Sequence, residues 1–181
     1  AVRTHAGLID ASFLGVVRVG GADRVAFLHN LLTQDIKALA PGSAAEAALV
    51  TPVGKLLADM VVWVEVYTHW LIVPRTRVEA VLKGLDHYLI TEQVTLDDQT
   101  AAQAIVALQG PASQDLFKGI SGVPARAVAH SITGSPGLLI MAPAEQSTTL
   151  QENLLARGAT RVGPDALNVM SCDSEPREVG T

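Results

Sequence analysis

One aspartate stands inside an otherwise apolar, strand-like stretch, TPVGKLLADMVVWVEV, at residues 51–66. An ionised carboxylate costs free energy when it leaves water without a partner, so the position of Asp59 needs an explanation. Asp59 is either a solvated residue on the wet face of an antiparallel strand or a carboxylate at the base of a pocket. In a pocket, it would accept hydrogen bonds from the ring N–H groups of a flat heterocycle or stabilise a developing cation.

The alternation of this stretch predicts which side chains accompany Asp59. Because successive side chains of a strand point to opposite faces, the odd positions place Leu57, Val61 and Trp63 on the face of Asp59. The even positions form an unbroken apolar face, made of Leu56, Ala58, Met60, Val62, Val64 and Val66. We therefore expect one face to pack against a core and the other to meet water or a ligand.

The other reactive side chains follow no established catalytic or metal-binding pattern. The chain has no phosphate-binding loop, no GxGxxG, no HExxH and no CxxC. Cys172 is the single cysteine, so no internal disulfide forms. No metal site is predicted, and each of the five histidines is expected to be a surface or helix-face residue: His5, His29, His69, His87 and His130.

Composition limits the class of protein. Of the 181 residues, 49% are hydrophobic and 17% are charged, which is typical of a packed globular chain. A net charge of −5 gives no basic surface for nucleic acid. No apolar run reaches the roughly 18 to 20 residues of a membrane span, and the first residues lack a signal-peptide pattern. We expect a cytoplasmic protein that binds neither nucleic acid nor membrane.

The elements around the Asp59 strand recur in the second part of the chain. The strand–Gly–helix pattern of residues 16–28 returns at 104–117, and the strand of 70–74 returns at 138–143. The short connections favour an α+β fold with antiparallel sheets. We predict a first α+β half at residues 1–100 and a second at 101–181, with an irregular tail from about residue 170. The second half has no clear equivalent of the Asp59 strand.

Three phrases together resemble one family. AGLIDASFLGVVRVGGADRVAFLHNLLTQDI, GKLLADMVV and IVALQGPAS are similar, in order and spacing, to phrases of the glycine-cleavage T-proteins, or aminomethyltransferases. They are equally similar to the folate-binding iron–sulfur assembly factors. The likeness covers about residues 5–170.

The resemblance implies a tetrahydrofolate-binding fold: duplicated ferredoxin-like α+β halves with antiparallel sheets, lacking the C-terminal β-barrel of relatives. It implies that Asp59 lies beside the folate nitrogens that carry the one-carbon unit, as binding and catalytic residue, with Val61 and Trp63 facing the ligand. Ala58 replaces the first aspartate of the T-protein pair. Asp173 is the nearest match to a pterin-binding glutamate.

The same resemblance leaves three functions open. The first is a tetrahydrofolate-binding protein of the aminomethyltransferase type, taking the 5,10-methylene or 5-formyl form, with a lipoylated carrier protein as a further partner. The second is a non-enzymatic, folate-dependent accessory protein for iron–sulfur enzymes. The third is a degenerate, truncated paralogue acting as an interaction module. Apolar surface left where a barrel would pack predicts a homodimer or higher oligomer.

Overall fold

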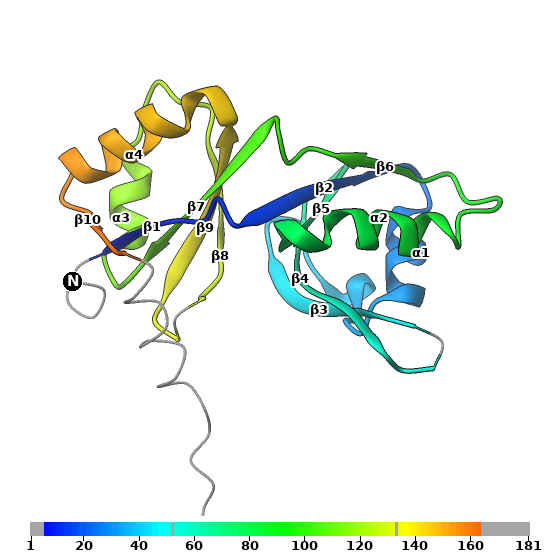
Figure 1. Cartoon of the computed structure of the whole chain (residues 1–181). Coiled ribbons are helices and arrows are strands. Elements are labelled where there is room, and N and C mark those ends of the chain that lie inside the picture. Colours follow the sequence, from blue (N-terminus) through cyan, green and yellow to red (C-terminus); the bar gives the residue numbers. More distant parts are fainter. Residues whose placement is uncertain (1–5, 52, 133, 164–181) are drawn as a thin grey trace, which may run out of the picture. The chain divides into compact units, whose positions relative to one another are not determined.

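The structure is a computed structural model that describes residues 6–51, 53–132 and 134–163 (Figure 1). The chain divides into two compact units. We call Ser12–Ala104 the first unit, and the second unit combines Ala1–Ala11 with Ile105–Thr181. Each unit has its own sheet and its own hydrophobic core.

The first unit is a five-stranded antiparallel sheet in the order β3-β4-β5-β2-β6. Two helices, α1 (Arg24–Leu31) and α2 (Val78–Asp86), follow β2 and β5 in the chain. Short 3-10 turns precede β3 and α2, at Ile36–Ala38 and Arg75–Arg77. The strands are β2 (Leu14–Gly20), β3 (Ala44–Val50), β4 (Leu56–Val64), β5 (His69–Pro74) and β6 (Thr95–Asp98).

The core of the first unit lies between its sheet and its helices. Leu28 of α1 and Val81 and Leu85 of α2 pack with alternate residues of the strands, including Met60 and Leu71. Both helices therefore cover one face of the sheet, which we call the helix side. Burial of this apolar area, at about 25 cal/mol per Å², is the main term that stabilises the unit.

The second unit is a five-stranded sheet in the order β10-β1-β7-β9-β8. Strand β1 is antiparallel to β7 and parallel to β10, and β8 is antiparallel to β9. The helices are α3 (Ser113–Lys118) and α4 (Ser147–Ala156), with a 3-10 turn at Ala144–Gln146. The strands are β1 (Gly7–Asp10), β7 (Gln103–Gln109), β8 (Arg126–Ala129), β9 (Gly137–Pro143) and β10 (Thr160–Arg161).

The two units share one topology. In the first, β2, α1, β4, β5, α2 and β6 follow each other, and the strands lie in the order β4-β5-β2-β6. In the second, β7, α3, β8, β9, α4 and β10 repeat this order, which is the ferredoxin-like pattern. The predicted α+β class with antiparallel sheets is confirmed.

The N-terminal strand is the main departure from the predicted organisation. Strand β1 lies between β7 and β10, where β2 and β6 of the first unit pair directly. The predicted first half spans residues 1–100, whereas the structure groups residues 6–11 with the second unit. Short apolar strands carry no local signal of their pairing partner, so the pattern along the chain did not reveal this insertion.

Candidate functional site

Strand β4 presents the predicted alternation over most of its length. Ala58, Met60 and Val62 are at most 4% exposed and belong to the helix-side core. Asp59 is exposed, Val61 is half-buried, and both face away from that core. The opposite face of the β3–β4 part of the sheet, which we call the Asp59 face, therefore holds the carboxylate in water.

The strand register shows what surrounds Asp59 on this face. Asp59 lies opposite Ala48 of β3, and Val61 lies opposite Glu46 of β3 and Ile72 of β5. The small side chain of Ala48 leaves space beside the carboxylate. Glu46 is exposed, and diagonal neighbours in an antiparallel pair lie about 7–8 Å apart, within reach of long side chains. Glu46 was not predicted as a site residue, although the alternation in AAEAALV places its side chain on the opposite face of β3 from Ala47 and Leu49.

The two carboxylates of the Asp59 face have no protein partner in the described ranges. Neither Asp59 nor Glu46 has a hydrogen bond or an ion pair there. A free, solvated carboxylate can accept hydrogen bonds from an incoming N–H group or attract a cation. Among the described residues, no three or more His, Cys, Asp or Glu side chains are grouped so that they could hold a metal ion. Asp59 and Glu46 therefore do not belong to a candidate metal site.

Trp63 is placed differently from Asp59 and Val61. Only 2% of its surface is exposed, and it lies opposite Trp70 of β5. The Trp70 Nε1–H donates a hydrogen bond of 3.0 Å to Glu65 Oε2. Trp63 also lies four residues from Asp59, about 13 Å along an extended strand. The indole therefore lies on the same face of the sheet as Asp59 but is buried, so it is not a free wall beside the carboxylate.

The predicted position of Leu57 on the Asp59 face is wrong. The register of β3 and β4 shifts between Leu49 and Val50, so that Leu49 lies opposite Ala58 and Val50 opposite Leu56. This irregularity turns Leu57 toward the helix-side core, where it packs, and leaves Leu56 51% exposed. Leu56 and Leu57, which precede this register shift in β4, therefore face the opposite sides from those that the alternation of residues 58–64 predicts for them.

The remaining predicted positions have separate outcomes. Ala58 is buried in the helix-side core, so the missing first aspartate would not have reached the Asp59 face from this strand. Asp173 lies outside the described residues. His69, expected at the surface or on a helix, is instead buried in β5 with 2% exposed. Alternation with Leu71 and Val73 would have revealed this burial.

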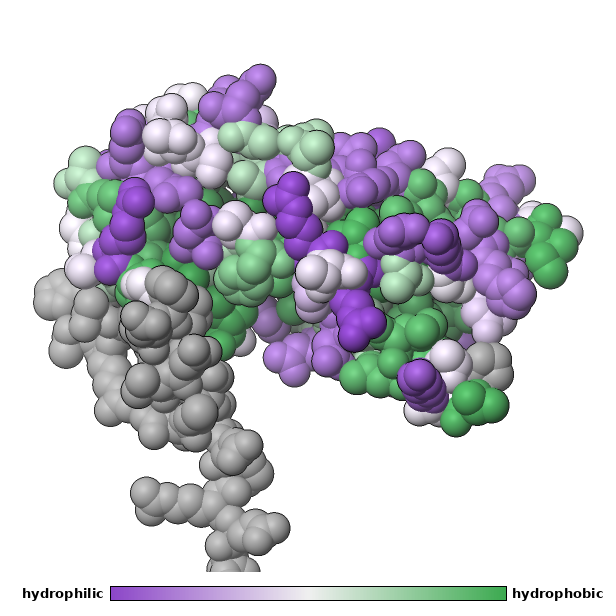
Figure 2. All heavy atoms as spheres, in the orientation of Figure 1, coloured by the Kyte–Doolittle hydropathy of each residue, from purple (hydrophilic) through white to green (hydrophobic). Residues whose placement is uncertain are grey.

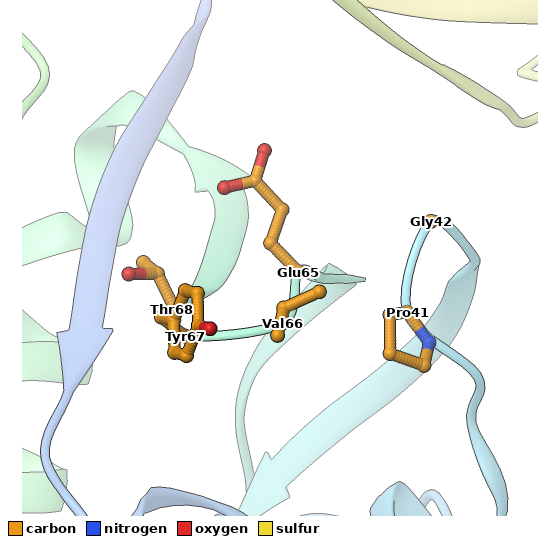
Figure 3. Close-up of a pocket in the computed structure, with 6 residues that line it drawn as sticks. All are labelled: Pro41, Gly42, Glu65, Val66, Tyr67 and Thr68. Atoms are coloured by element: carbon orange, nitrogen blue, oxygen red, sulfur yellow. The ribbon is translucent and has the colours of Figure 1, made fainter.

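A shallow hollow lies beyond the C-terminal end of β4, away from Asp59 (Figure 3). Pro41 and Gly42 form one side of it, and the β4–β5 turn, residues 65–68, forms the other. Tyr67 at the tip of the turn is 85% exposed. None of Asp59, Val61 and Glu46 lines the hollow, so it is separate from the Asp59 face.

The exposed apolar side chains are dispersed along the chain. On the face shown in Figure 2, hydrophobic residues at the surface are interspersed with hydrophilic ones. The large hydrophobic residues exposed in the described ranges are Phe13, Val53, Leu56, Val66, Tyr67 and Ile90. None of the helices in those ranges has the length and apolar content needed to cross a bilayer.

Two duplicated ferredoxin-like sheets, with the free carboxylates of Asp59 and Glu46 exposed on one of them, define an α+β protein with a candidate ligand-binding face. Residues 1–122 match the family described as GCVT N-terminal domain, and the chain belongs to that family.

The relatives support the same assignment. The chain is 33% identical over 122 residues to the aminomethyltransferase of Bacillus subtilis (strain 168), which covers 67% of this chain and 33% of that protein. It is 30% identical over 179 residues to the aminomethyltransferase of Geobacillus kaustophilus (strain HTA426), covering 88% and 49%. The chain thus spans between a third and a half of the length of these curated relatives.

Solved structures share the fold. The glycine cleavage system aminomethyltransferase T from Bartonella henselae superposes with a TM-score of 0.83 at 23% identity, over 93% of this chain and 51% of that one. A chain of the heterotetrameric sarcosine oxidase from Corynebacterium sp. U-96 gives a TM-score of 0.51 at 18% identity, over 97% and 88%. At these identities the likeness is evidence for the fold alone.

Proposed function

We propose that this chain is a tetrahydrofolate-binding domain of the aminomethyltransferase type, and that the Asp59 face binds the folate. The observation that carries the proposal is the free carboxylate of Asp59, exposed on a sheet whose other face is sealed by its own helices. It lies within the part of the chain that matches the family. In this proposal the ligand is the 5,10-methylene or 5-formyl form.

The chemistry of the Asp59 face fits a nitrogen heterocycle. An ionised carboxylate accepts hydrogen bonds from ring N–H groups and stabilises positive charge that develops on a nitrogen during one-carbon transfer. Val61, two residues further on the same face, offers an apolar contact to the ring. Trp63 follows on the same face, where its indole is buried and so borders the ligand surface as a packed rather than a free side chain. Asp173 keeps its predicted role as a second pterin contact.

Catalysis and partners belong to the same proposal. We infer that the reaction is an aminomethyl transfer in which Asp59 is the charge-stabilising residue, and that a lipoylated carrier protein delivers the group. The chain spans 49% of the length of the Geobacillus kaustophilus relative, so folate binding is the part of this proposal that the chain can test directly.

The first test is a calorimetric titration with 5-formyl-tetrahydrofolate. We expect saturable heat, and Asp59→Asn should weaken binding by about tenfold to a hundredfold, the range for losing a hydrogen bond to a charged group. Asp86→Asn is the matched control, because Asp86 is an exposed carboxylate at the end of α2. No heat at high micromolar ligand, with a folded protein by circular dichroism, would contradict the proposal.

A folate-dependent accessory role for iron–sulfur enzymes is the second candidate, and Ala58 favours it. The single aspartate of GKLLAD resembles the assembly factors more than the paired-aspartate T-proteins. Deleting the gene distinguishes the two: the accessory role requires a fall in iron–sulfur enzyme activities, whereas the aminomethyltransferase role requires a fall in glycine cleavage. Light scattering over a wide concentration range tests the interaction-module alternative, for which a monomer would be the contrary result.

A further inference from the structure

His69 is a buried ionisable group that the proposed folate site does not use. It is the first residue of β5, and alternation along this strand places its imidazole with Leu71 and Val73 in the helix-side core. Its Nδ1 has no hydrogen-bond partner among the described residues. A buried charge without a partner is far more costly than a buried neutral ring, so this place in the core favours the neutral imidazole.

The second unit has an apolar residue at the place equivalent to His69. Strands β5 and β9 both end in a proline, Pro74 and Pro143, and both are followed by a 3-10 turn and a helix. Counting back from these prolines sets Leu138 in the place of His69. Leu138 is buried in the core of its own unit. The first unit therefore has a titratable ring where its structural counterpart has a hydrocarbon.

A permanent cation lies close to the imidazole. The guanidinium of Arg24, in the first turn of α1, donates to the carbonyl oxygens of Gly21 at 2.9 Å and Val66 at 2.6 Å. Its Nε is buried without a partner. Arg24 thus ties α1 to the β4–β5 turn. Burial lowers the pKa of His69 below its ordinary 6.5. The Thr68 backbone opposes part of this shift, and the charge of Arg24 adds a smaller lowering of its own.

Within the described residues, no carboxylate acts on His69 to compensate a charge there. The cross-strand neighbours of His69 are Val19 and Val64, which do not ionise. Asp23, next to Arg24, already accepts a hydrogen bond from the Gln93 amide at 2.8 Å. Glu65 is bonded to the indole of Trp70, which follows His69 and so points to the other face of the sheet. Protonation would therefore place an uncompensated positive charge on a buried ring, with the half-buried Arg24 as a second cation acting on it.

We propose that His69 is an acid-sensitive latch on the β4–β5 turn, which releases the Arg24–Val66 contact when the imidazole takes up a proton. The turn, residues 65–68, forms one side of the hollow in Figure 3, so acidification changes the shape of that hollow. Because the unfolded chain takes up the proton at the ordinary value and the folded core resists it, stability is full above pH 6.5. It is lost as the pH falls below 6.5.

The test is an NMR titration of the whole chain from pH 7.5 downward. We expect the His69 imidazole to titrate below 6.5, and the amide signals of Val66 and Tyr67 to shift with the same midpoint. His69→Gln, which cannot take up the proton, should abolish this shift. His87→Gln, at an exposed histidine of the same unit, should leave it unchanged.

A stability measurement keeps the proposal testable if the turn signals are broad. Below pH 6.5 the unfolding constant of the wild-type first unit should rise by up to about tenfold per pH unit through His69, and His69→Gln should remove that part of the slope. Turn amides that do not titrate, or that titrate equally in His69→Gln, would overturn the latch. A folate affinity unchanged by His69→Gln at pH 7.5 would leave the folate proposal standing, so the two ideas fail separately.

Discussion

The two units use the same topology and differ most in one strand. Strand β4 of the first unit runs from Leu56 to Val64 and pairs along its length with β3, whereas its equivalent β8 runs only from Arg126 to Ala129 and lies at the sheet edge. The extra hairpin strand β3 and the longer β4 create the exposed Asp59 face. The difference indicates that the fold needs only a short strand at this place, and that the additional length serves another purpose.

The largest expected effect tests whether the units are independent. Leu71 in β5 and Ile140 in β9 are equivalent and fully buried. Replacing either with alanine should cost about 2–5 kcal/mol of unfolding free energy. Both tryptophans of the protein, Trp63 and Trp70, lie in the first unit, so urea unfolding followed by fluorescence should respond to Leu71→Ala and hardly to Ile140→Ala. Equal shifts of the fluorescence midpoint would show that the units unfold as one.

A smaller effect is expected from Gln109, a buried polar side chain of the second unit. Gln109, fully buried, donates through Nε2 to the His130 and Leu138 carbonyls and accepts from the Ile132 amide at 3.1 Å. Gln109 directly precedes Gly110, which has a positive φ. In the first unit Gly20 directly precedes the positive-φ Gly21, so Gly20 occupies the equivalent place. Gln109→Ala should lower the unfolding free energy by about 1–3 kcal/mol by leaving these groups unsatisfied.

Circular dichroism during denaturation measures this loss. Exposed Gln93 provides the control, since Gln93→Ala should change stability by no more than about 0.5 kcal/mol. If both variants were equally stable, water would have to replace the Gln109 side chain in its hydrogen bonds to His130, Ile132 and Leu138.

The smallest expected effect concerns Glu46, which the second unit lacks together with β3. Glu46→Gln should weaken folate binding by only about two- to fivefold, because an exposed carboxylate adds at most about 1 kcal/mol to a nearby charge contact. Titration calorimetry alongside Asp59→Asn ranks the two carboxylates of the Asp59 face. A loss larger for Glu46→Gln than for Asp59→Asn would move the centre of the site from β4 to β3.

Regular alternation explains what the sequence could predict. Ala58, Met60 and Val62 were assigned to the packed face, and Asp59 and Val61 to the other, because the side chains of a strand alternate. The α+β class with antiparallel sheets followed from the same local patterns. The register shift at Leu49 and Val50 was not predictable, since it depends on how β3 and β4 pair rather than on either strand alone.

The burial of His69 was not predicted, for a different reason. Its polar residue type favours the surface, whereas its position two residues before Leu71 places its side chain on the buried face of β5. The position in the strand decided the outcome, and the residue type did not.

The place of β1 determines the order in which the halves can be completed during synthesis. Residues 7–10 leave the ribosome before the first unit, but their partners in β7 and β10 emerge only after that unit has been made. All strands of the first unit can therefore pair before the strands that pair with β1 have been synthesised. Removal of residues 7–10 would accordingly harm the half of the protein that is translated last.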